Sequence, residues 1–201
     1  MKDIIKTINY YNNNAKKLID RYNNANLKSL HNLLLKYSNK EDFVLELGFG
    51  IGREIEFLIK NGYKNIYGID GSIEFVKIVK ENFNSENFVH SILPNINLPK
   101  NIKFDFIYSI AVWMHLPIEI YEETIKNIVN LLNHNGRVLI SFSLEDRNEE
   151  ERYFHKVDEN LLDSLFKKYN MKKILDVITQ DGLQRQLKWK NIIYQKVVNV
   201  K

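Results

Sequence analysis

From residue 42 onward the chain alternates short apolar segments with longer amphipathic ones, and this alternation constrains the fold more than any other feature. The first apolar segment, FVLEL at 43–47, ends at a glycine, as expected of a buried parallel strand. Further strands are predicted at 65–69, 87–92, 104–110 and 137–142. Strands that alternate with helices in this way indicate an open, mostly parallel sheet with helices on both faces.

Amphipathic spacing predicts the helices between these strands and at the chain ends. They are expected at 4–22, 27–37, 52–60, 73–83, 121–132 and 161–169. The helix at 121–132 is expected to end near Asn135-Gly136, a helix-stop signal. Segments 172–180 and 189–198 flank the turn signal Asp181-Gly182, as in an antiparallel pair of strands.

Length and composition indicate one ordinary globular domain. The chain has 201 residues, 44% of them apolar and 27% charged, with a net charge of +4. We expect a single domain over 1–201, with an N-terminal helical segment at 1–40 and the sheet domain at 41–201. Dispersed lysines favour solubility and give little support for nucleic acid as a partner.

The chain has no cysteine, which excludes disulfides, a thiolate metal site and a cysteine nucleophile; no metal is expected. No apolar run approaches the ~20 residues that span a bilayer, and the N-terminus lacks the apolar core of a signal peptide. A soluble, cytoplasmic protein without a membrane partner is the expectation.

A glycine-rich loop, ELGFGIG, follows the first strand and places Gly48, Gly50 and Gly52 at alternating positions. Glycine permits a tight turn and lets a ligand approach the backbone closely. A dinucleotide fingerprint would need glycine or alanine where Arg53 stands. Glu46, two residues before the first glycine, suits a ligand with a cationic amino group rather than a pyrophosphate.

Asp70 ends the second strand, where a carboxylate can accept hydrogen bonds from both hydroxyls of a ribose. The same Asp-Gly-Ser sequence could instead form a turn or a helix N-cap. S-adenosylmethionine has an amino group and a ribose and lacks a pyrophosphate. Glycines, Glu46 and Asp70 in this order therefore favour it as the ligand.

The segments VLELGFGIGRE, YGID, FDFIYSIAVWMHLP and NHNGRVLISF resemble the class I S-adenosylmethionine-dependent methyltransferases over about residues 42–145. The resemblance implies a Rossmann-like, seven-stranded sheet whose last strand is antiparallel, and an N-terminal helical lid. It implies that the glycine loop holds the methionine part and that Asp70 holds the ribose. The adenine is expected at Ser91 and Ile92, where many members of the family carry an acidic residue. The implied cofactor contacts are Glu46, Gly48, Phe49, Gly50, Gly52, Arg53, Asp70, Gly71, Ser72, Ser91, Ile92 and Ser109.

The same resemblance places Ser109, Trp113 and His115 beside the cofactor methyl group. His115 is either a general base or a structural histidine at a helix entrance. Trp113 either walls the acceptor pocket or fills the core.

Several side chains are candidates for binding an acceptor. Arg53 either faces the cofactor carboxylate or an anionic acceptor, or is an exposed or ion-paired arginine in the first turn of a helix. An arginine fork suits a carboxylate or phosphate. The further candidates, in the lid, after the fifth strand and between the last two strands, are Tyr11, Tyr22, Arg147, Arg185 and Trp189.

The favoured function is methyl transfer from S-adenosyl-L-methionine to an oxygen or nitrogen of a small molecule, either neutral or anionic, with S-adenosyl-L-homocysteine as the product. The tetrad that amino-methylating nucleic-acid enzymes use after the fourth strand is replaced here by Ser-Ile-Ala-Val at 109–112. A tRNA or protein methyltransferase, a catalytically inactive cofactor-binding subunit and an NAD-dependent enzyme are the alternatives.

Overall fold

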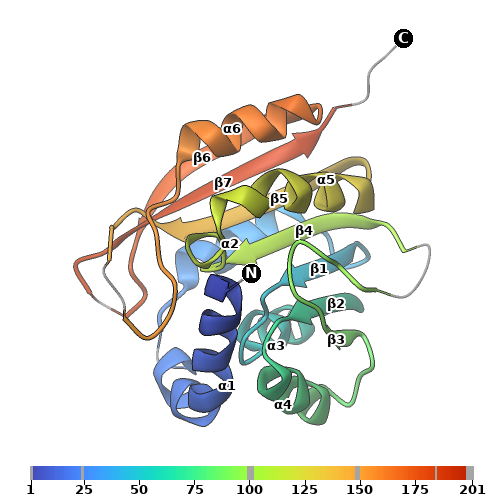
Figure 1. Ribbon diagram of the computed structural model, residues 1–201. Helices are drawn as coiled ribbons and strands as arrows, with labels where there is room; N and C mark the ends of the chain where they lie inside the picture. The colour runs from blue at the N-terminus through green and yellow to red at the C-terminus, as the bar shows by residue number, and fades with distance from the viewer. Residues whose placement is uncertain (1, 24, 99–101, 148–149, 184, 198–201) are drawn as a thin grey trace.

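The computed structural model describes residues 2–23, 25–98, 102–147, 150–183 and 185–197, and their strands form one sheet in the order β3-β2-β1-β4-β5-β7-β6 (Figure 1). β7 is antiparallel to both of its neighbours, and the other pairs are parallel. The predicted seven-stranded sheet with an antiparallel last strand is confirmed. The strands are β1 (Phe43–Leu47), β2 (Asn65–Asp70), β3 (Phe88–His90), β4 (Phe104–Ile110), β5 (Leu132–Ser143), β6 (Met171–Gln180) and β7 (Lys188–Lys196).

The helices cover both faces of this sheet. One apolar cluster joins the sheet to α5 and α6, and a second joins it to α2, α3 and α4. Strand residues such as Val44 and Leu45 have no exposed surface, as expected for a sheet covered on both faces. In the described part of the chain, no helix has the length and apolarity needed to cross a membrane. The helices are α1 (Lys2–Asn23), α2 (Lys28–Tyr37), α3 (Arg53–Lys60), α4 (Ile73–Phe83), α5 (Tyr121–Leu131) and α6 (Glu159–Lys168), with short 3-10 turns η1 (Trp113–His115) and η2 (Ile118–Ile120).

The predicted end of α5 is wrong. The helix ends at Leu131, and β5 begins at Leu132, which pairs with Phe104. Lys196 of β7 donates to the carbonyls of Val129 and Leu132 at 2.9 and 3.1 Å, so a distant side chain satisfies the end of the helix. The Asn-Gly signal instead lies within β5, where the register shifts and Asn135 has a φ of 60°.

α1 lies beside the edge of the sheet where the parallel strands end, on the same side as the β5–α6 segment and the β6–β7 turn (Figure 1). Its Asn12 accepts a hydrogen bond from Ser72 Oγ at 2.7 Å. Ser72 is itself the N-cap of α4 and accepts from the N–H of Phe75 at 3.3 Å. α1 is therefore tied to the start of α4, next to the end of β2.

Candidate functional site

A cavity of about 280 Å³ lies at the carboxyl ends of the parallel strands, where ligands of open α/β sheets bind. Its walls come from the glycine loop, the ends of β2, β3 and β4, α1, the β5–α6 segment and the β6–β7 turn. Most of the residues singled out in the sequence line it: Tyr11, Tyr22, Glu46, Gly48, Phe49, Gly50, Arg53, Asp70, Gly71, Ser72, Ser91, Ile92, His115, Arg147, Arg185 and Trp189.

Gly50 presents bare backbone to this cavity. Its φ is +54°, and a Cβ at this position would meet no other atom within 4 Å. Gly48 is required for a different reason, because a Cβ there would lie 2.5 Å from Cγ2 of Val112. The loop is thus packed against the segment after β4 at Gly48, whereas the space next to Gly50 is open.

Asp70 holds the glycine loop and the start of α4 together. Its Oδ2 accepts from the N–H of Gly50 at 2.8 Å, and its Oδ1 accepts from the N–H of Ser72 at 2.7 Å. Burial raises the pKa of Asp70 to about 6, although these two N–H groups and the charge of His90 act in the opposite direction. The buried carboxylate is incompletely compensated and would gain from further hydrogen-bond donors in the cavity.

Glu46 lies deeper, with 1% of its surface exposed, and accepts a hydrogen bond from Tyr108 at 2.9 Å. Burial, followed by the neighbouring charge of Glu54, raises the pKa of Glu46 well above its ordinary value. Arg53 forms an ion pair with Glu54 at 2.8 Å and donates to the carbonyl of Tyr22 at 2.7 Å. Arg53 is therefore ion-paired, as one of its two expected roles requires, and it still lines the cavity.

At the end of β3 the Ser91 hydroxyl is occupied by its own loop. It donates to the carbonyl of Asn95 at 2.9 Å and accepts from the N–H of Asn97 at 3.0 Å. Ile92 lines the cavity beside it. This part of the wall therefore offers an apolar surface and backbone groups.

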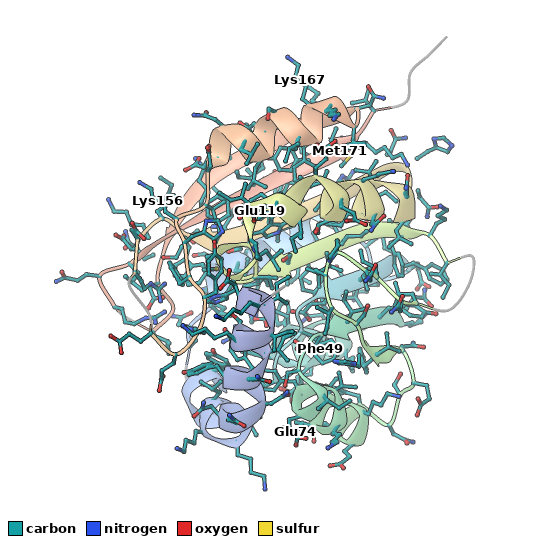
Figure 2. All side chains as sticks on the ribbon, in the orientation of Figure 1. Phe49, Glu74, Glu119, Lys156, Lys167 and Met171 are labelled. Carbon is teal, nitrogen blue, oxygen red and sulfur yellow. The ribbon has the colours of Figure 1, made fainter. Side chains whose placement is uncertain are left out.

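Phe49 contributes to the cavity wall, but its ring packs in the core. The ring is edge-on to Phe88 and lies over Gly68, where a Cβ would come within 2.6 Å of it. Figure 2 shows Phe49 in the interior, between α1 and α4. We therefore expect the packing of the Phe49 ring in the core to hold the glycine loop in place.

Three of the expected contacts do not line the cavity and are corrected here. Trp113 is 1% exposed and packs edge-on against Tyr121 in the core, so core filling is the role that its position allows. Ser109 is also 1% exposed, because β4 is enclosed between β1 and β5. Gly52 faces α4, where a Cβ would lie 2.9 Å from Val79, so this glycine serves helix packing.

A second group of polar side chains lies where α1, η1 and the β5–α6 segment meet. Arg152 donates to the Tyr11 hydroxyl at 2.6 Å, and that hydroxyl is 3.3 Å from Nε2 of His115. Nδ1 of His115 lies 2.7 Å from the carbonyl of Tyr153. Arg147 stacks over the ring of Phe154, 4.8 Å from its centroid. This part of the cavity therefore combines cations with one basic imidazole.

Asp181, read in the sequence only as part of a turn, positions two of the acceptor candidates. It accepts from Arg185 at 2.9 and 2.6 Å and from Nε1 of Trp189 at 2.9 Å. Burial opposes ionisation, but the hydrogen bonds from Arg185 and Trp189 leave the pKa of Asp181 below its ordinary value. The only signal in the sequence for this arrangement is an aspartate four residues before an arginine.

The cavity is covered by chain segments that are joined to one another. Thr7 of α1 accepts from the N–H of Tyr153, and the N–H of Asn26 donates to the carbonyl of Gly182, at 3.1 and 2.8 Å. In the described ranges, no group of three or more histidine, aspartate or glutamate side chains could hold a metal ion. α1 and the β6–β7 turn therefore form part of the cover of this cavity.

Residues 19–189 match the family described as the methyltransferase domain. An uncharacterized methyltransferase of Alkaliphilus oremlandii is 26% identical over 135 residues. That match covers 65% of this chain and 61% of the relative, so the chain spans less than two thirds of the curated relative's length.

Two solved structures share the fold. The 1,6-didemethyltoxoflavin-N1-methyltransferase of Burkholderia thailandensis, with bound 1,6-didemethyltoxoflavin and S-adenosylhomocysteine, has a TM-score of 0.76 and 16% identity, with coverage of 97% of this chain and 88% of that one. The magnesium protoporphyrin IX methyltransferase of Synechocystis PCC 6803, with bound S-adenosylmethionine, has a TM-score of 0.65 and 19% identity, with coverage of 84% and 77%. At these identities the likeness concerns the fold.

Proposed function

Because the chain belongs to the methyltransferase domain family, we propose that it transfers a methyl group from S-adenosyl-L-methionine to an oxygen or nitrogen of a small acceptor. S-adenosyl-L-homocysteine is the other product. Both cofactor forms occur in the structural relatives named above. The observation that carries the proposal is the pairing of open backbone at Gly50 with the buried carboxylate of Asp70.

The residues of the cavity fit this cofactor. The space above Gly50 admits a ligand where any larger residue would project a side chain. The ribose hydroxyls would supply donors to Asp70, whose raised pKa reflects incomplete compensation. Glu46, two residues before the first glycine of the loop, would face the amino group of the cofactor. Ser91 and Ile92 would face the adenine through backbone and apolar contacts.

The cofactor supplies an activated methyl group with a good leaving group. The protein therefore has to align the acceptor and exclude water. α1 and the segment that joins it to α2 serve as a lid, since both line the cavity. His115 acts as general base where the acceptor atom carries a proton.

A small acceptor is favoured because segments of the same chain cover the cavity. Arg147, Arg152 and Arg185 line it together, and their guanidinium groups suit an acceptor that bears a carboxylate or phosphate. Tyr22 and Trp189 would flank the acceptor with aromatic surface. A tRNA or protein substrate would need the lid to open widely.

Calorimetry with S-adenosylmethionine, S-adenosylhomocysteine and NAD tests the proposal. We expect the first two to bind and NAD to give no signal. Incubation with labelled cofactor should then yield labelled small molecules and S-adenosylhomocysteine. Label retained in tRNA or protein would favour the macromolecular alternative, and binding without turnover of any cell extract would favour an inactive subunit.

A further inference from the structure

Three side chains from distant parts of the chain form a continuous hydrogen-bonded row in the cavity. Arg152 Nη1 is 2.6 Å from the Tyr11 hydroxyl, and this hydroxyl is 3.3 Å from His115 Nε2. His115 Nδ1 is 2.7 Å from the carbonyl oxygen of Tyr153. All three side chains line the cavity. The row therefore lies where an acceptor would bind.

Hydrogen-bond chemistry restricts the direction of the protons in this row. A carbonyl oxygen only accepts, so Nδ1 of His115 carries the proton in the Nδ1···Tyr153 contact. Nε2 of the neutral ring is then a lone-pair acceptor. A guanidinium only donates, so the Tyr11 oxygen accepts from Arg152, and its own proton can be donated to Nε2 of His115 or to the hydroxyl of Tyr22. His115 is thus held in the tautomer that can take a proton from Tyr11.

We infer that Tyr11 relays the proton of the acceptor to His115, and that Arg152 stabilises the negative charge that develops on the Tyr11 oxygen during this transfer. The acceptor atom then belongs to an O–H or N–H group that is protonated at neutral pH. This inference rests on the proposed methyl transfer. A carboxylate acceptor, already ionised, would need no such relay.

Protons and electrons balance in this step with the cofactor, the acceptor, Tyr11, His115 and solvent alone. The acceptor's O–H or N–H proton moves to the Tyr11 oxygen while the Tyr11 proton moves to Nε2 of His115. The electron pair left on the acceptor atom forms the bond to the methyl carbon, and the pair of the broken carbon–sulfur bond stays on sulfur. The imidazolium that remains then loses its proton to solvent. No other reactant is required.

The surroundings of Tyr11 explain why it needs both partners. Burial and the neighbouring hydroxyl of Tyr22 raise the pKa of Tyr11, whereas the charge and hydrogen bond of Arg152 lower it. A transient negative charge on this oxygen is therefore costly without Arg152. Among the described residues, the charged groups that share this cavity besides Arg152 are Arg53, Arg147, Arg185, Glu46, Glu54, Asp70 and Asp181.

Nitrogen NMR of the full-length protein with S-adenosylhomocysteine tests the row without any acceptor. We expect the proton of the neutral His115 ring on Nδ1, and a changed Nε2 resonance in Tyr11→Phe. Tyr10→Phe is the matched control, because Tyr10 is the next residue on α1, 5.4 Å from Tyr11 between ring centroids, and does not line the cavity. A proton on Nε2 would overturn the relay whatever the turnover.

Kinetics then separate a relay from a merely structural role. The probe acceptors are phenols of increasing acidity. On phenol itself, Tyr11→Phe should lower kcat about 100-fold, which is within the usual range of general-base catalysis. The loss should be progressively smaller on nitrophenols, because these are ionised at neutral pH and have no proton to relay. The KM for S-adenosylmethionine should not change. An equal loss on all phenols, or turnover of carboxylates alone with no effect of Tyr11→Phe, would overturn the inference. Absence of S-adenosylmethionine binding in calorimetry would instead defeat the proposed function and leave the NMR result standing.

Discussion

The affinity for S-adenosylmethionine should depend on the ionisation of Asp70. Burial raises the pKa of this carboxyl to about 6 from an ordinary value of 3.8. Because the folded-state pKa is raised, this carboxyl leaves the stability of the ligand-free protein unchanged below about pH 3.8 and lowers it as the pH rises to about 6. At 1.36 kcal/mol per pKa unit, the ionised carboxylate costs roughly 3 kcal/mol.

Ribose hydroxyls would offset part of this cost, since they donate to the charged form. Binding then requires the carboxylate, and protonation competes with it. With a pKa of about 6, roughly one tenth of the carboxyl groups are ionised at pH 5, so the Kd should be about tenfold higher at pH 5 than at pH 7.

Calorimetry at pH 7, 6 and 5 measures this dependence directly. Asp70→Asn should bind more weakly at pH 7 by about 1.5–3 kcal/mol, the usual contribution of a hydrogen bond to a charged group, and its Kd should not vary over this range. Asp105→Asn is the matched control. Asp105 also accepts a hydrogen bond from a backbone N–H, that of Phe43 at 2.9 Å, but Phe43 is the first residue of β1 and lies far from the carboxyl ends of the strands.

The reasoning is refuted if Asp70→Asn keeps the tenfold pH dependence, or if the wild-type Kd is the same at pH 5 and pH 7. Either result would mean that the Asp70 carboxylate does not contact the ligand. A pH dependence that disappears in Asp105→Asn would point to an indirect effect on folding.

Three further substitutions test the glycine loop and the lid. Gly50→Val should abolish cofactor binding in calorimetry, because its side chain enters the open space of the cavity. The φ of +54° also strains a valine at this position, so circular dichroism is used to check the fold; wild-type affinity would contradict the loop geometry. Gly48→Ala should lower the free energy of unfolding by about 1–3 kcal/mol, since its Cβ would overlap Val112, and the added change Val112→Ala should restore part of it; no rescue in denaturant titrations would argue against this contact. Asn12→Ala removes the acceptor for the Ser72 hydroxyl, so it should lower the free energy of unfolding by about 1 kcal/mol and speed up hydrogen exchange of the amides of α1. Unchanged exchange would show that this hydrogen bond does not hold α1 in place.

The strands and the glycine loop could be predicted from the sequence because their signals are local. β1 and β4 begin and end where the apolar runs do, and each run is bounded by polar residues or glycine. The approach of Asp70 to Gly50 follows once the structure shows that β1 and β2 are neighbouring parallel strands, since both residues come at the carboxyl ends of these strands. Periodicity and strand order therefore suffice for this half of the site.

The direction of individual side chains after β4 could not be predicted. Trp113 and His115 lie in the same 3-10 turn, yet the first fills the core and the second lines the cavity. The end of α5 was misplaced for a related reason, because Lys196 from β7 supplies its capping contacts. In both cases a neighbour distant in the chain decides the local conformation.

By itself the sequence determined the succession of strands and helices along the chain, the glycine-rich loop after the first strand and the carboxylate of Asp70 that ends the second. Only the tertiary structure decided that Tyr11 meets His115 and Arg152, which lie 104 and 141 residues away. The physical reason is that a hydrogen bond needs its atoms placed within a few tenths of an ångström. That placement results from the packing of α1, the sheet and the β5–α6 segment together, and no spacing within any one of them encodes it.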